Sequence, residues 1–301
     1  MVGIEQTTSM QRGGCAAGCN TSTPPGENMP FAPINGTDVY YEIDGFGDCV
    51  FMLHHGFGCT KMWEHIYPDL VDQGFKTIRY DRKGYGQTAA GVFSYDFYVS
   101  DRFREASVQE LEALRHWLGV DSFHVIGQCE GGVLAMDYAS AYPERVKTAV
   151  ISSTLCYSAK PLWQFNAEKF TKAFHELAPQ SQEKFRDWHG AMVEEFFEQF
   201  RRFGGEYGKD FFDLRPVLKT VTCPTLVLYP DRSFLFEVEQ GVAFYRSLPR
   251  GELAVIPRCG HNTYEEKPEL YTRLVIDFLQ RCRYGSGGVE PAAAQPVTCA
   301  S

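Results

Sequence analysis

The chain has 301 residues, of which 44% are hydrophobic and 22% charged, and its 29 Lys and Arg against 38 Asp and Glu leave a net charge of −9. These fractions are typical of a globular chain with a core and exclude a collagen, a coiled coil and wholesale disorder. The acidic balance, with no run of five like charges, argues against general nucleic-acid binding. The apolar runs fall far short of the ~20 residues of a membrane span, so we expect no membrane partner.

Ten cysteines are the unusual feature of the composition. Disulfide scaffolds are usually short and rich in Cys, and this chain is neither. The first 14 residues also lack the apolar segment of a signal peptide. We therefore expect a cytoplasmic protein in which most thiols are reduced.

Strands and helices are predicted to alternate between two disordered tails, residues 1–27 and 284–301, which are rich in small and polar residues. The hydrophobic pattern predicts strands over 39–42, 50–54, 77–80, 123–126, 146–152, 225–229 and 253–256, and helices over 61–71, 101–118, 131–142, 238–248 and 269–281. This alternation predicts a mostly parallel sheet with helices on both faces, which binds ligands at the carboxyl ends of its strands.

One segment, residues 156–222, interrupts this alternation, because it has helical patterning and many aromatic residues but no convincing strand. It is predicted to be a helical lid inserted into a core formed by residues 28–155 and 223–283. Most of its aromatic side chains are expected to pack the lid onto the body. Trp163, Phe165 and Trp188 are the candidates for lining a substrate pocket, since such pockets are largely apolar.

The segment Gly127-Gln-Cys-Glu-Gly131 lies between a predicted strand and a predicted helix. This is the pattern of a nucleophile elbow, with Cys129 at the position where Ser is commoner. The sharp turn favours glycine on both sides and places the sulfur over a helix N-terminus, which lowers a thiol pKa. The N–H group of Glu130 is then placed for an oxyanion hole. A buried structural Cys beside a chance pair of glycines is the simpler alternative.

Three more segments end predicted strands: Leu53-His-His-Gly-Phe-Gly58, Tyr80-Asp-Arg-Lys-Gly-Tyr-Gly86 and Ile256-Pro-Arg-Cys-Gly-His261. Together with the elbow and the lid, they resemble the lid-bearing α/β-hydrolase superfamily, in the family's order, over about residues 31–283. The resemblance implies Cys129 as nucleophile and His261 as general base. It also implies that the backbone N–H of Phe57 completes the oxyanion hole.

The chain departs from the family pattern at the acid that usually orients the histidine. After the strand that follows the lid, the register places Ser233 at the usual acid position, and Asp231 lies two residues earlier. Asp231 either orients His261 or caps the turn. A Cys–His pair can rest as thiolate and imidazolium, so it depends less on the acid than a Ser–His pair does.

These residues predict hydrolysis or transfer of an activated acyl group, such as an ester, lactone or thioester, of a small apolar substrate. A thiolate is a good leaving group, so plain alkyl esters suit it less well. No cofactor is implied, and the histidines show no metal-ligand spacing. Two alternatives stay open: a ligand-binding receptor on the same fold, and a lyase or C–C bond hydrolase that uses His261 as base.

Overall fold

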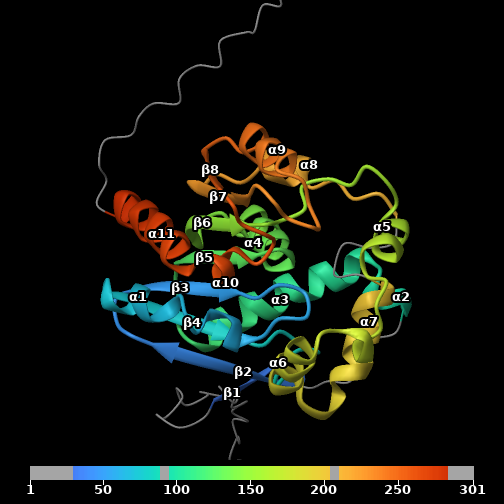
Figure 1. Ribbon diagram of the computed structural model, residues 1–301. Helices are drawn as coiled ribbons and strands as arrows, with labels where there is room; N and C mark the ends of the chain where they lie inside the picture. The colour runs from blue at the N-terminus through green and yellow to red at the C-terminus, as the bar shows by residue number, and fades with distance from the viewer. Residues whose placement is uncertain (1–29, 89–94, 204–209, 284–301) are drawn as a thin grey trace, which may run out of the picture.

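The computed structural model describes residues 30–88, 95–203 and 210–283 (Figure 1). Its centre is an eight-stranded sheet in the order β1-β2-β4-β3-β5-β6-β7-β8, antiparallel at β2 and parallel from β4 to β8. The two predicted tails, 1–27 and 284–301, lie outside the described residues. The strands are β1 (Phe31–Ile34), β2 (Thr37–Asp44), β3 (Asp48–Leu53), β4 (Phe75–Tyr80), β5 (Phe123–Gln128), β6 (Val146–Ser152), β7 (Thr225–Pro230) and β8 (Gly251–Ile256).

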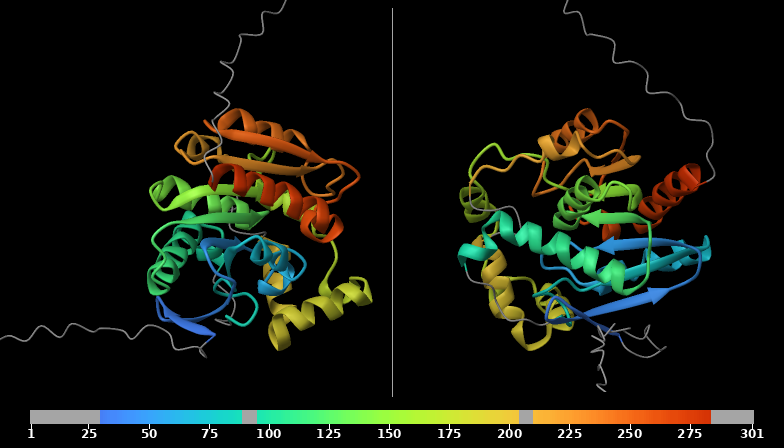
Figure 2. Two further views of the ribbon diagram at one scale, coloured as in Figure 1. Left: turned by 90° about the vertical axis from the view of Figure 1, so that its left-hand side faces the viewer. Right: turned by 180° about the vertical axis from the view of Figure 1, so that it is seen from behind.

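Helices cover both faces of the sheet, as the two turned views in Figure 2 show. One face carries α3 (Asp101–Trp117), α4 (Glu130–Ala141), α8 (Arg215–Leu218) and α9 (Glu239–Ser247), and α2 (Tyr95–Tyr98) precedes α3. The other carries α1 (Tyr67–Asp72), α10 (Thr263–Glu266) and α11 (Pro268–Arg283). Successive residues of a strand point to opposite faces of the sheet. In β3, Phe51 packs on the face covered by α3 and α4, and Met52 packs on the face covered by α1 and α11.

The predicted elements are present within a few residues at either end, except that the helix expected over 61–71 is divided and that three short elements, β1, α2 and α10, were not predicted. Strand β1 was not predicted, because it is four residues long and contains Pro33, which a sheet tolerates only at its edge. The helix expected over 61–71 is broken into a 3-10 turn, η1 (Thr60–Trp63), and α1. Pro68 explains the break, since proline fits the first turn of a helix and not its interior.

The insertion contains α5 (Leu162–Lys169), α6 (Pro179–His189) and α7 (Val193–Phe203), with 3-10 turns η2 (Phe174–Glu176) and η3 (Gly190–Met192). These helices lie together beside the sheet, on the right of Figure 1. Phe174, Phe196 and Phe197 of the insertion form one buried cluster with Phe57 of the β3–η1 loop, whereas Trp188 of α6 packs in the core cluster that contains side chains of α1 and α11. Leu214 and Leu218, near the end of the predicted lid segment, pack instead with α4 and α9 in the main core. Within the described residues, the helices are too short or too polar to cross a membrane.

Candidate active site

The turn from β5 into α4 has the geometry of a nucleophile elbow. Cys129 has φ 52° and ψ −112°, a region that side-chain-bearing residues rarely adopt, and its N–H donates to Ser152 O at 2.8 Å. A Cβ on Gly127 would lie 2.3 Å from the Gly131 carbonyl oxygen, and one on Gly131 would lie 2.2 Å from Leu53 O. Both flanking positions therefore require glycine, and the strained Cys129 is held by its neighbours.

The loop carrying His261 is fastened directly to this elbow. Gln128, the residue before Cys129, donates from Nε2 to the His261 carbonyl oxygen at 2.9 Å. Ser153 Oγ donates to the same oxygen at 2.7 Å, and Thr263 Oγ1 donates to Gln128 Oε1 at 3.2 Å. These bonds fix the backbone of His261 against the residues that end β5 and β6, so the loop and the elbow form one unit.

The imidazole of His261 contacts Ser233 rather than an acid. Its Nδ1 lies 3.1 Å from Ser233 Oγ. Asp231 instead accepts the Cys259 N–H at 3.1 Å, and the hydrogen bonds of the described residues do not join it to His261. Of the two roles left open for Asp231, the contacts are those of a turn cap. Burial, with a smaller contribution from His55, lowers the pKa of His261 to about 3, so the ring is neutral near pH 7.

The two N–H groups assigned to the oxyanion hole come from adjacent segments. Phe57 is buried and has φ 62°, and Glu130 is the first residue of α4. A Cβ on Gly56 would lie 2.1 Å from a carboxylate oxygen of Glu130, so the Glu130 side chain packs against the loop that carries Phe57. The side chain of one candidate donor residue thus contacts the loop of the other.

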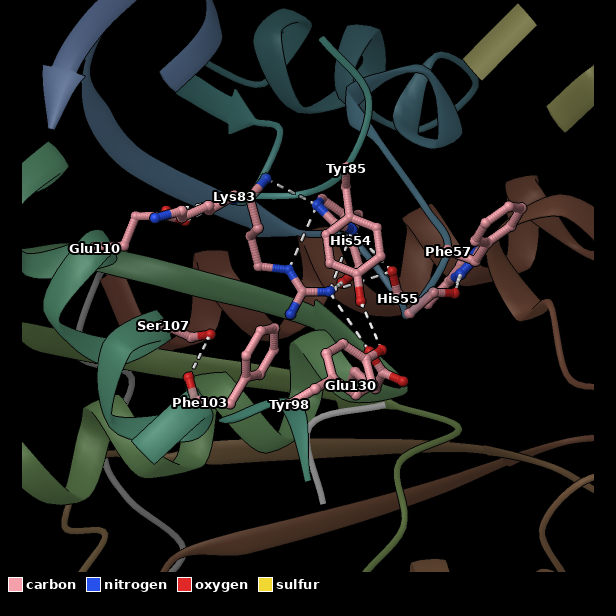
Figure 3. Close-up of polar contacts among 12 residues, drawn as sticks. His54, His55, Phe57, Lys83, Tyr85, Tyr98, Phe103, Ser107, Glu110 and Glu130 are labelled. Atoms are coloured by element: carbon pink, nitrogen blue, oxygen red, sulfur yellow. Dashed lines mark hydrogen bonds and ion pairs between the residues drawn. The ribbon is translucent and has the colours of Figure 1, made fainter. Parts of the chain in front are cut away.

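A buried arginine connects the same two segments. Arg82 Nη2 donates to the carbonyl oxygens of His54 at 3.2 Å and His55 at 3.3 Å. It also lies 3.8 Å from Glu130 Oε2, and both side chains are almost fully buried. Figure 3 shows His54, His55 and Glu130 grouped in this region, with Tyr85 beside them. The charge pair therefore holds the loop after β3 against the elbow.

His189, at the end of α6, links the insertion to the β3–η1 loop that carries Phe57. The Gly86 N–H donates to its Nδ1 at 3.0 Å, so Nε2 carries the proton and donates to Phe57 O at 3.2 Å. The centroids of the His189 and Phe57 rings lie 4.4 Å apart. Burial lowers the pKa of His189 to about 4. The insertion therefore fixes the backbone of Phe57 through a neutral histidine.

We expect His189→Phe to destabilise the fold by about 1–3 kcal/mol at pH 7.5, because it leaves the Gly86 N–H buried without its acceptor. The difference in unfolding free energy between the wild type and this variant should be smaller at pH 5.5. There the unfolded wild-type chain protonates His189 near its ordinary pKa of 6.5 while the folded protein, with a pKa of about 4, does not. Urea unfolding at the two pH values measures this, and an equal deficit at both would contradict it.

The structure separates the three predicted pocket residues. Trp188 is buried, with its ring 6.0 Å from His55. Phe165 stacks on Phe236, whose ring lies 5.5 Å from His261, so Phe165 stands in a second layer. Trp163 is 59% exposed, and the ring contacts among described residues do not link it to the site. Its placement does not match that of a pocket wall.

Sequence reasoning missed Arg82, His189 and Tyr264 as site residues. Tyr264 contacts His55 Nε2 through its hydroxyl at 3.1 Å, and burial, with smaller contributions from Glu265, Cys59 and Cys129, raises its pKa. Its only sequence signal is its position three residues after His261. Within the described residues, groups of three or more His, Cys, Asp or Glu side chains that could hold a metal are absent.

Comparisons with known proteins agree with this fold. Residues 49–191 match the family model of the alpha/beta hydrolase fold. The chain is 25% identical over 292 residues to 2-hydroxy-6-oxo-6-phenylhexa-2,4-dienoate hydrolase of Comamonas testosteroni, covering 87% of this chain and 99% of that protein. It is 25% identical over 268 residues to the pimeloyl-(acyl-carrier protein) methyl ester esterase of Yersinia enterocolitica, covering 81% and 98%.

Among solved structures, the enol-lactonase from Burkholderia xenovorans LB400 superposes with a TM-score of 0.68 at 20% identity, covering 83% of this chain and 100% of that one. The sheet order, the elbow and these matches show that the chain has the α/β-hydrolase fold. The fold class predicted from the sequence, including the helical insertion, is confirmed.

Proposed function

We propose that the protein is a hydrolase of activated acyl bonds, with Cys129 as nucleophile and His261 as the proton-transfer group. The observation that carries the proposal is the left-handed backbone of Cys129 between two glycines that accept no side chain. Such strain persists only where the surrounding structure enforces it, and it gathers at functional sites. The names of the relatives, a methyl ester esterase and an enol-lactonase, favour an ester or lactone substrate.

In the proposed reaction the Cys129 sulfur attacks the acyl carbon while its proton passes to His261 Nε2. The carbonyl oxygen becomes an oxyanion that accepts hydrogen bonds from the N–H groups of Phe57 and Glu130. The intermediate collapses, the bond to the leaving group breaks, and His261 returns the proton to that group. Water then attacks the thioester and gives one proton to His261, the carbon–sulfur bond breaks to release the acid, and His261 returns that proton to the Cys129 sulfur. No cofactor takes part in these steps, and a second nucleophile in place of water would give acyl transfer.

Cleavage of a C–C bond is the second candidate, and the relative from Comamonas favours it. The substrate in that protein's name is a keto acid without an ester, so its hydrolysis breaks a carbon–carbon bond. In this version His261 activates water or moves protons on the substrate, and Cys129 is not acylated. The two candidates therefore differ in whether a covalent intermediate forms.

The test is intact-protein mass spectrometry after an acid quench during turnover of a p-nitrophenyl ester. We expect one acyl adduct, mapped by peptide analysis to Cys129. Cys156→Ala, at another buried thiol, should keep the adduct, and Cys129→Ala should lose both the adduct and turnover. Turnover of a dienoate ketone without an adduct would support C–C cleavage instead. Tight ligand binding with neither adduct nor turnover would support a receptor.

A further inference from the structure

The Ser233 hydroxyl is held by two backbone N–H groups as well as by His261. The N–H of Leu235 donates to Ser233 Oγ at 3.2 Å, and the N–H of Phe236 donates to it at 3.1 Å. A hydroxyl oxygen has two acceptor lone pairs and one proton to donate. The two N–H groups occupy both lone pairs, so the remaining hydrogen-bonding capacity of Ser233 is its own proton.

That proton is directed at the imidazole, because Ser233 Oγ lies 3.1 Å from His261 Nδ1. If the hydroxyl donates, Nδ1 is an acceptor and carries no proton. A neutral imidazole then carries its proton on the other nitrogen, Nε2. A carboxylate at the same position would have the opposite effect, since it only accepts and would require the proton to be on Nδ1.

We propose that Ser233 is a positioning residue that holds neutral His261 in the tautomer with its proton on Nε2, so that the resting ring offers a donor where a general base is needed. The inference rests on the proposed function, in which Nε2 receives the thiol proton. To become that base, the ring must lose its Nε2 proton to solvent and gain one at Nδ1, with no net change in charge. Nδ1 must then donate to Ser233 Oγ, which displaces one of the two backbone N–H bonds.

The surroundings of the imidazole disfavour the two other arrangements at Ser233. In one of them the ring is turned so that its nitrogens exchange places, and in the other the ring is a charged imidazolium. Phe234 and Phe236 contact the imidazole edge-on, at 5.6 and 5.5 Å between ring centroids, so turning the ring to exchange its nitrogens would disturb both contacts. Phe165 of α5 stacks behind Phe236. A charged imidazolium would require three donors at one hydroxyl oxygen, and the low pKa of His261, about 3, agrees with its being disfavoured.

The test reads the tautomer directly by two-bond ¹H–¹⁵N NMR of the full-length protein labelled with ¹⁵N at histidine, with His261 assigned by its absence in His261→Gln. Near pH 7.5 we expect the wild type to hold the Nε2–H form in about fivefold excess or more, the factor that one hydrogen bond typically supplies. Ser233→Asp should reverse the ratio. It should also move the acidic limb of the kcat/KM profile to higher pH, because a carboxylate raises the pKa of its histidine.

Ser233→Ala, which removes the hydroxyl without adding charge, should bring the two tautomers close to equal and keeps the test decisive if Ser233→Asp does not fold. A wild-type spectrum with the proton on Nδ1, or a ratio unchanged in both variants, would overturn the proposal. The spectrum requires no turnover. Its outcome is therefore separate from that of the adduct experiment, which tests the proposed function itself.

Discussion

Changing Cys129 to Ser should lower kcat/KM for a p-nitrophenyl ester by about 10³- to 10⁴-fold, although Ser is the commoner nucleophile at this elbow. A serine hydroxyl needs a base that is oriented and stabilised as imidazolium, and loss of the acid from such a triad costs about 10⁴-fold in kcat. Here His261 contacts a hydroxyl, Ser233 Oγ, at 3.1 Å. A thiol ionises far more readily, so the neutral histidine suffices for Cys129 and not for Ser.

The matched variant restores the missing acid. In the Cys129→Ser background, Ser233→Asp should recover at least about 10²-fold of the lost kcat/KM, because the carboxylate can then hold the Nδ1 proton and stabilise the imidazolium. The same Ser233→Asp change in the Cys129 enzyme should have a much smaller effect. Steady-state kinetics on the four proteins measures this. A Cys129→Ser enzyme within tenfold of the wild type would show that the nucleophile and the acid position are independent.

The sequence predicted the fold well because its strongest signals are local. The strand that leads into Gly127 and the helix that follows Gly131 show a clear change of hydrophobic period, and the structure has β5 and α4 there. The break at Pro68 was as visible in the sequence as the apolar pattern around it. The proline overrides the apolar pattern, because it cannot occupy a helix interior without losing a hydrogen bond.

The supporting contacts of the site were harder to predict, because they join residues far apart in the chain. His189 reaches Phe57 across 132 positions, and Arg82 reaches His54 across 28. Neither the residue types nor their spacing in the sequence predicts such contacts. The position of Ser233 after the predicted strand did place it at the usual acid position. Whether Asp231 could reach His261 instead depended on the conformation of the turn after β7. That turn directs the Asp231 carboxylate to the Cys259 N–H.

The buried pair of Arg82 and Glu130 leads to the largest stability effect that we expect. Glu130→Gln keeps the size of the side chain and the backbone N–H but removes the carboxylate charge that lies 3.8 Å from Arg82 Nη2. Arg82, only 1% exposed, would then keep its charge in the interior without this partner. Breaking such a pair typically costs about 3–5 kcal/mol. We expect a loss of this size in the free energy of unfolding, measured by urea denaturation at pH 7.5.

An exposed pair supplies the control, because burial rather than pairing causes the expected cost. Arg281 and Glu252 lie 2.8 Å apart with side chains 44% and 45% exposed, and Glu252→Gln should change the unfolding free energy by less than about 1 kcal/mol. If Glu130→Gln were equally mild, the remaining contacts of Arg82, the His54 and His55 carbonyl oxygens among them, would compensate its charge adequately. Adding Arg82→Met to Glu130→Gln should cost less than the sum of the single changes, since removing the second charge relieves the penalty created by removing the first.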